Sequence, residues 1–227
     1  MKWIDKRTPP VSFEQWKVNF TTTHGRAPIY DDLVGEPRQC LKLELLEEQG
    51  YLCCYCLARI DMWDSHIEHF IPRSAPKRNP AKYLGKDIEL GYDNLFLSCE
   101  GEHFQKDRCG RYKDDASADN LLSPADPLAD SVFEYTVDGH ISSQNQQAAN
   151  LIIAANLESK ALTRHRETAI YNSGFFDDDF EDKREALIRF YHSRDDHGAF
   201  TPFCMAITYI LEQTNRCSEP ASQLSEV

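Results

Sequence analysis

The sequence predicts an α+β protein in which a small pair of strands lies between helical segments. Two short apolar runs, residues 67–71 and 95–98, have the length of single strands. Apolar residues recur at helical spacing before these runs and again from residue 144 onward. A chain of 227 residues can bury one sizeable core with an added lobe. We expect these regions along the chain: an N-terminal segment and helix at 1–50, a core with a hairpin at 51–143, a helical lobe at 144–216 and a flexible tail at 217–227.

Before the strands, residues 13–20 are expected to form a short helix or turn. Residues 41–48 carry leucines at helical spacing and are followed by Gly50, a residue type that commonly ends helices. The segment between the two strands is rich in proline and glycine, which indicates a loop. The segment at 103–113, after the second strand, is expected to include a further helix.

After the core, Asp138-Gly139 is a strong reversal signal and predicts a hairpin between residues 132–137 and 140–141. The chain is then expected to be helical from Gln144, because apolar residues recur on one face of such a helix: Leu151, Ile152, Ala155 and Leu162. Two further helices are expected around 186–191 and 203–211.

Four of the eight cysteines have the spacing of a metal site. Cys53 and Cys56 are separated by two residues, so that one turn can present both thiolates to one tetrahedral ion. Cys99 and Cys109 are the best second pair and would close the site through a loop. We predict a structural zinc ion here; the alternative is a set of buried free thiols. Cys54 is expected to point elsewhere, and the lone cysteines are expected to be packing or surface thiols: Cys40, Cys204 and Cys217.

A second group of residues has the chemistry of a hydrolytic site. His69, at the end of the first strand, has an ordinary pKa near neutrality and can take a proton from water. We expect the amide oxygen of Asn94 to hold the ring N–H of His69 and so to fix its tautomer. Glu68 and His69 reach one substrate only if the strand ends or twists there, and Pro72 supports such an ending. Each residue alone is more often structural, and it is their order and spacing that favour a catalytic set.

A divalent ion is expected beside this base. Glu68 and His103 are the expected ligands, because an oxygen ligand, a histidine and open water positions suit Mg²⁺ or Mn²⁺ better than zinc. A base, a carboxylate and such an ion together predict hydrolysis of nucleic-acid phosphodiester bonds. His66 is a weaker candidate, which we expect to be a strand-edge or substrate-side histidine and not a ligand.

The motifs follow one another in a fixed order: Cys53-Cys54-Tyr55-Cys56, Ile67-Glu68-His69-Phe70-Ile71-Pro72-Arg73-Ser74, Tyr92-Asp93-Asn94-Leu95, Cys109-Gly110-Arg111-Tyr112-Lys113 and Leu122-Ser123-Pro124-Ala125-Asp126-Pro127. Over roughly residues 1–170 the chain resembles the HNH (ββα-metal) nucleases, and among them the PtuB-like nuclease subunit of the Septu antiphage system. The resemblance implies a zinc-stapled ββα-metal core and an ABC/SMC-like ATPase partner of the PtuA type. In some systems the resemblance also implies, as a further partner, a retron reverse transcriptase with its RNA and DNA.

The sequence departs from the general HNH pattern at one place. HNH enzymes generally carry Cys-His-x-x-Lys, whereas here Glu102 takes the place of the cysteine and His103-x-x-Lys106 keeps its place. Either His103 is the distal metal ligand, which we favour, or that ligand is missing. A missing ligand would leave a catalytically inactive zinc scaffold that only bridges the ATPase and nucleic acid.

The charge distribution limits how the chain binds nucleic acid. The net charge of −12 argues against a free-standing binder, because duplex affinity comes mostly from phosphate neutralisation. Residues 59–113 hold ten Lys and Arg against nine Asp and Glu, so the remaining residues carry −13. A basic partner is therefore expected to supply most of the substrate affinity. The expected phosphate contacts, which could instead be solvated loop residues, are these: Arg73, Lys77, Arg78 and Lys106.

These observations predict a metal-dependent HNH endonuclease, with DNA favoured and RNA as the alternative substrate. It would be the effector subunit of an antiphage complex whose ATPase docks on residues 144–211. The charged N-terminus has no apolar run and the sequence has no transmembrane run, so we expect a cytoplasmic protein. The cysteine content also fits a reducing compartment.

Overall fold

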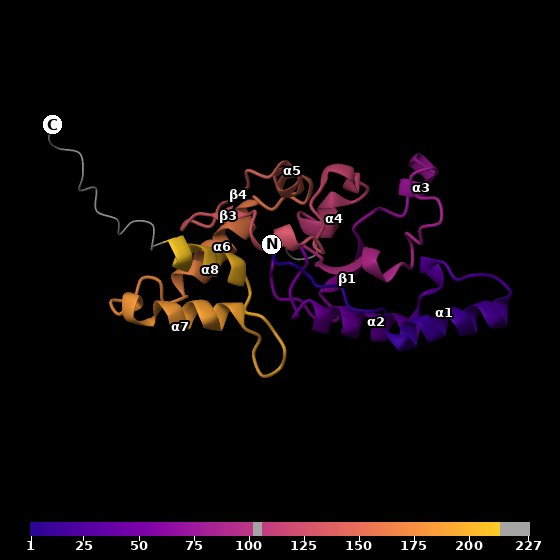
Figure 1. Ribbon diagram of the computed structural model, residues 1–227, viewed down its shortest axis with the longest axis horizontal. Coiled ribbons are helices and arrows are strands. Elements are labelled where there is room, and N and C mark those ends of the chain that lie inside the picture. Colours follow the sequence, from indigo (N-terminus) through magenta and orange to yellow (C-terminus); the bar gives the residue numbers. More distant parts are fainter. Residues whose placement is uncertain (102–105, 214–227) are drawn as a thin grey trace, which may run out of the picture.

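The computed structural model describes residues 1–101 and 106–213 (Figure 1). Two helices, α1 (Val11–His24) and α2 (Gly35–Glu48), lie along one edge of the molecule and contact each other (Figure 1). Helix α2 ends before Gly50, as predicted; Gly50 has a φ of 60°. Helix α1 is longer than expected and continues to His24, and the hydroxyl groups of its last threonines donate to carbonyl oxygens one turn back: Thr21, Thr22 and Thr23.

The predicted strand pair is present and antiparallel. Strand β1 (Ser65–His69) pairs with β2 (Leu95–Cys99), so that His69 lies opposite Leu95 and Ser65 lies opposite Cys99. Strand β1 ends at His69, before Pro72, as the sequence indicated. Every residue of β2 is buried, which places this strand at the centre of the core.

A short helix follows the strands. Helix α4 (Cys109–Lys113) packs against β2 and gives the order β1, β2, α4. The predicted helix at 103–113 is confirmed over these residues, whereas residues 102–105 lie outside the described part of the chain. The connection between β1 and β2 contains one short helix, α3 (Ala75–Arg78), and otherwise turns and loops.

The predicted hairpin is present but its strands are shorter than expected. Strands β3 (Glu134–Tyr135) and β4 (Ile141–Ser142) pair around the Asp138-Gly139 turn. Gly139 has a φ of 83°, and a Cβ atom there would lie 2.1 Å from the carbonyl oxygen of Thr163. The close approach of the following helices therefore requires glycine at this turn.

Four helices complete the described chain: α5 (Gln146–Ala154), α6 (Lys160–Tyr171), α7 (Phe180–His192) and α8 (Cys204–Gln213). Helix α8 packs against α6, α7 and β3. Helices α6, α7 and α8 gather at the end of the molecule opposite α1 (Figure 1). The helices predicted after Gln144 are therefore confirmed, and among these described residues no helix is long and apolar enough to cross a membrane.

A buried ion pair fastens the N-terminal strand-like segment to the core. The Nζ atom of Lys6 lies 2.6 Å from Glu48 and donates to the carbonyl oxygen of Leu95 at 3.0 Å. The other oxygen of Glu48 accepts from the backbone N–H of Arg7 and from the hydroxyl of Tyr92. The side chains of Lys6 and Glu48 are 8% and 1% exposed. Removal of one partner would therefore leave an uncompensated charge in the core.

We predict that Glu48→Gln lowers the free energy of unfolding by about 3 kcal/mol, because buried Lys6 would lose the carboxylate that offsets the cost of burying its ammonium group. Urea denaturation of the two proteins measures this difference. The matched control is Glu14→Gln, which breaks the more exposed pair with Lys17 on α1 and should cost less than about 0.5 kcal/mol. Equal effects of the two substitutions would contradict the anchoring role of Glu48.

Candidate functional site

The four cysteines predicted to bind zinc converge in the structure. The Sγ atoms of Cys53, Cys56, Cys99 and Cys109 all lie within 4.8 Å of one another and are buried. The Sγ atoms of Cys56 and Cys99 are 3.9 Å apart. Thiolates about 2.3 Å from a tetrahedral zinc ion would lie about 3.8 Å apart, so the cluster fits such an ion. The metal would tie the turn before β1 to the end of β2 and the start of α4.

The remaining described cysteines do not join this cluster. Burial raises the pKa of the Cys54 thiol well above its ordinary value, and its backbone N–H donates to Leu97. Cys40 is half-buried on α2, and Cys204 is buried at the start of α8. Cys54 thus lies outside the cluster, and Cys40 and Cys204 are lone thiols, which agrees with the expectation of packing or surface thiols. Cys217 lies outside the described residues.

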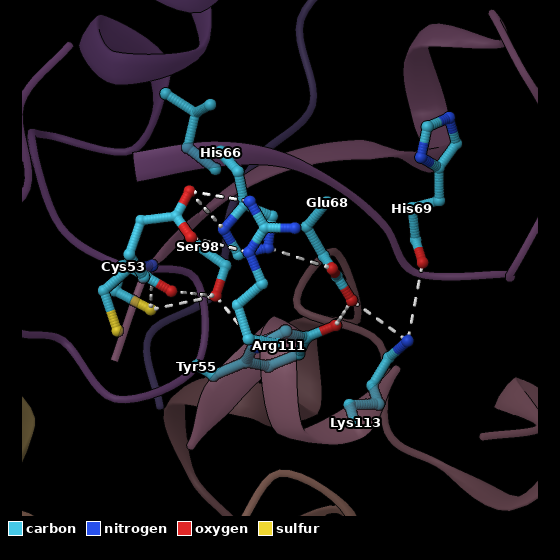
Figure 2. Close-up of polar contacts among 12 residues, drawn as sticks. Cys53, Tyr55, His66, Glu68, His69, Ser98, Arg111 and Lys113 are labelled. Atoms are coloured by element: carbon cyan, nitrogen blue, oxygen red, sulfur yellow. Dashed lines mark hydrogen bonds and ion pairs between the residues drawn. The ribbon is translucent and has the colours of Figure 1, made fainter. Parts of the chain in front are cut away.

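Glu68 is held from two sides within the core. Its Oε1 atom accepts from the hydroxyl of Tyr55 at 2.9 Å and lies 3.0 Å from the Nζ atom of Lys113 (Figure 2). Burial raises the pKa of this carboxyl, but contacts with His66 and Lys113 outweigh burial and hold the pKa below its ordinary value. Glu68 is therefore an ionised carboxylate, with Oε1 already engaged and Oε2 turned toward His66.

His69 points away from Glu68, although the two are neighbours in the chain (Figure 2). Its Nε2 atom lies 2.9 Å from the carbonyl oxygen of Glu89, and its ring meets Tyr30 edge to face at 4.5 Å. A carbonyl oxygen only accepts hydrogen bonds, so Nε2 carries the proton and Nδ1 keeps its lone pair. Burial is the main cause that lowers the pKa of His69, which leaves the imidazole neutral near pH 7.

The predicted contact between Asn94 and His69 is wrong. The Oδ1 atom of Asn94 accepts from the backbone N–H of Ile71 at 2.7 Å. Its Nδ2 atom donates to the carbonyl oxygens of Ile71 and Ile88 at 2.9 and 2.8 Å. These three hydrogen bonds all join Asn94 to the connection after β1, so Asn94 shapes that connection and the backbone of Glu89 fixes the tautomer of His69.

His66 lies beside Glu68 on the same face of β1. Its Nε2 atom is 3.5 Å from Oε2 of Glu68, and its Nδ1 atom is 3.4 Å from Oε1 of Glu100. Glu100 is in turn held by two contacts from Arg111, at 2.6 and 2.8 Å. His103, the expected metal ligand, lies outside the described residues.

These residues open into a cavity of about 850 Å³. Glu68, His66 and His69 line it together with five basic side chains: Arg38, Arg73, Lys77, Lys106 and Arg111. Three of the four predicted phosphate contacts are therefore at the cavity. The fourth, Arg78, is not among its lining residues and instead donates to the carbonyl oxygen of Asp115 at 2.9 Å.

Sequence reasoning missed several residues that shape the site. Tyr55 and Lys113 stand within the quoted cysteine motifs, but nothing in their spacing shows that they hold Glu68. Glu89 acts through its backbone and has no side-chain signature. Arg38 comes from α2, and Arg111 from α4, so only the folded chain brings them to the cavity.

We predict that the purified protein carries about one zinc ion per chain. Cys53→Ser or Cys109→Ser should release the zinc and lower the thermal midpoint of unfolding, because structural zinc binding is coupled to folding. Elemental analysis and thermal denaturation measure both effects. The control is Cys40→Ser, whose thiol lies outside the cluster and should leave the zinc content unchanged. Wild-type protein without zinc would contradict the assignment of the cluster.

No family model matches the chain. Over 96 residues, which are 41% of this chain, it is 30% identical to a protein of Vibrio cholerae serotype O1 biovar El Tor named "Retron Vc95 putative HNH endonuclease". The match spans 42% of the length of that protein. This similarity supports a nuclease role for a chain whose carboxylate, histidines and basic side chains already share one cavity.

Proposed function

We propose that this protein is a metal-dependent HNH endonuclease that hydrolyses phosphodiester bonds of nucleic acid, with DNA as the favoured substrate. One observation carries the proposal. A single cavity of about 850 Å³ is lined by an ionised carboxylate, Glu68, by a neutral imidazole, His69, and by five cationic side chains, and four further acidic residues also line it: Asp31, Glu89, Asp114 and Asp115. This combination supplies the elements that phosphodiester hydrolysis needs, namely a base, charge neutralisation and a place for a metal.

His69 is the proposed general base. The hydrogen bond from Nε2 to the carbonyl oxygen of Glu89 fixes the ring and leaves the lone pair of Nδ1 to take a proton from water. Contact with Tyr30 further limits rotation of the ring. Asn94 acts as a positioning residue, because its three hydrogen bonds fix the loop that follows His69.

The charged residues of the cavity would receive the phosphate. Arg73 comes from the loop after β1, Lys77 from α3 and Arg111 from α4, so cations approach the cavity from several parts of the chain. Glu68 would hold a divalent ion, Mg²⁺ or Mn²⁺. A bound ion would stabilise negative charge on the phosphate and on the leaving oxygen. In the sequence-based prediction His103 is the second ligand of that ion.

We further propose that the protein acts in antiphage defence together with an ABC/SMC-like ATPase, and in some systems with a retron reverse transcriptase. The sequence resemblance to PtuB-like subunits and the retron name of the Vibrio relative support this setting. The net charge of −12 also favours a partner that supplies affinity for nucleic acid. Exposed aromatic side chains at the end of α6 and just after it offer a docking surface: Tyr171 and Phe176.

We predict that His69→Ala lowers the cleavage rate by about 10²–10⁴-fold, the range typical for loss of a general base. Zinc content and thermal midpoint should stay close to wild type, because the His69 ring is apart from the cysteine cluster. Cleavage of labelled DNA and RNA with Mg²⁺ or Mn²⁺ measures the rate. The control is His165→Ala, which changes an exposed histidine on α6. Activity of His69→Ala within a few-fold of wild type would refute the mechanism.

The same assay tests the substrate and the partner. We expect weak, salt-sensitive cleavage by the isolated chain and faster cleavage with the ATPase, with DNA cut faster than RNA. Preferred cleavage of RNA would favour the RNase alternative. Absence of cleavage of either substrate, with the ATPase present, would favour the inactive zinc scaffold.

Docking is tested separately by co-purification with the ATPase. The double variant Tyr171→Ser and Phe176→Ser should weaken the complex, whereas Leu84→Ser, which changes a still more exposed apolar residue between β1 and β2, should not. An unchanged complex in the double variant would refute this docking surface and leave the nuclease assignment standing.

A further inference from the structure

We propose that His66 and Glu68 together bind the divalent ion of this site, and that Gly110 is glycine because a side chain there would displace both ligand atoms. The proposal rests on the proposed nuclease function. It names a histidine of β1 as a metal ligand, where sequence reasoning placed His103 in that role.

The two side chains are aligned by the strand that carries them. Residues two apart in a strand share a face, so His66 and Glu68 point to the same side of β1. The Nε2 atom of His66 lies 3.5 Å from the Oε2 atom of Glu68. This separation is longer than the 2.7–3.2 Å typical of N–H···O hydrogen bonds. It is close to the separation of about 3.0–3.4 Å between two neighbouring ligands that each lie about 2.1 Å from one ion.

The surrounding contacts leave Oε2 of Glu68 and Nε2 of His66 available to bind an ion. Tyr55 and Lys113 engage Oε1 of Glu68, so Oε2 remains for a ligand. On the other side of His66, Nδ1 faces the carboxylate of Glu100 at 3.4 Å. A metal at Nε2 would require the tautomer with the ring proton on Nδ1, the nitrogen that faces Glu100. Arg111 holds Glu100 in this position through two hydrogen bonds.

His66 is poorly satisfied by the protein alone. The residue is 9% exposed, and its buried Nδ1 atom has no partner at hydrogen-bond geometry among the described residues. A histidine that served only to pack the core would be expected to donate a normal hydrogen bond. The pair also lines the cavity that holds His69 and the basic side chains, so an ion bound there would meet an incoming phosphate.

Gly110 adds an independent constraint from α4. A Cβ atom at this position would lie 2.4 Å from Oε2 of Glu68 and 2.8 Å from Nε2 of His66. These are the two proposed ligand atoms, so helix α4 approaches both without a side chain between them. The backbone N–H of Gly110 donates to Ser98 on β2 at 3.0 Å, which holds the start of α4 in this close position.

The test is Mn²⁺ binding by the full-length, zinc-loaded chain, measured by calorimetry without substrate. We expect His66→Gln to weaken binding at least about tenfold, since even the partners behind metal ligands are worth about 10–100-fold in affinity. The comparison variant His69→Gln should bind Mn²⁺ like wild type, because its ring is directed at Glu89. Zinc content and thermal midpoint identify any variant that loses its fold.

Pulsed electron paramagnetic resonance of bound Mn²⁺ identifies the ligand in the wild-type fold. Protein with ¹⁵N-labelled histidine should show coupling from a directly bound imidazole. That coupling should disappear in His66→Gln and persist in His103→Gln. Gly110→Ala should weaken Mn²⁺ binding while the zinc content is retained.

These measurements test the role of His66 as a metal ligand separately from the nuclease function. Wild-type Mn²⁺ affinity in His66→Gln, or imidazole coupling lost only in His103→Gln, overturns the assignment of His66; cleavage by the wild type would then still support the nuclease. Coupling to His66 in a protein that cleaves neither DNA nor RNA would leave the metal site standing and refute the nuclease.

Discussion

The cysteine cluster is the constraint on which the rest of the site depends. Cys53 and Cys56 belong to the turn before β1, Cys99 ends β2, and Cys109 begins α4, so one ion would fix all of these segments together. The two-stranded sheet is too small to hold itself together, and α4 has only five residues. With the cluster formed, the first turn of α4 is fixed against β2. Cys109 and the hydrogen bond from Gly110 to Ser98 together set where the helix starts, and from there Gly110 and Lys113 reach Glu68.

Glu68 has both a structural role in the core and a proposed role as a metal ligand. Its two carboxylate oxygens have different surroundings, since Oε1 is engaged by Tyr55 and Lys113 and Oε2 faces His66. A lone buried carboxylate would be costly, and the contact with Lys113 offsets that cost. The same contact fixes the carboxylate plane. His69, the next residue, points the other way along the strand end, so that the proposed metal ligand and the proposed base are held by separate sets of contacts.

Much of the fold and part of the site could be predicted from the sequence. The strand pair, the end of α2 at Gly50, the Asp138-Gly139 hairpin and the later helices follow from local patterns. The cysteine cluster was predictable because thiolate spacing is a local signal. The hydrogen-bond partner of His69 was not predictable, because a backbone carbonyl has no side-chain signature. The side chain of Asn94 instead makes its hydrogen bonds to the backbone of Ile71 and Ile88. His66 and Glu68 are two residues apart, so a strand places them on one face. Their role as a metal pair could not be predicted, because Gly110, which is remote in sequence, approaches them only in the folded chain.

The basic side chains of the cavity are already partly neutralised. Arg73 lies 2.8 Å from Asp31, and both nitrogens of Arg111 that face Glu100 are within 2.8 Å of it. A phosphate must therefore share or displace these carboxylates, and it gains less than it would from free cations. The cavity is thus suited to orienting a phosphate and not to capturing one, and the acidic flanks work against capture. A partner that delivers nucleic acid to the cavity would resolve this conflict, because under the proposed function the chain would then need only to position the phosphodiester bond.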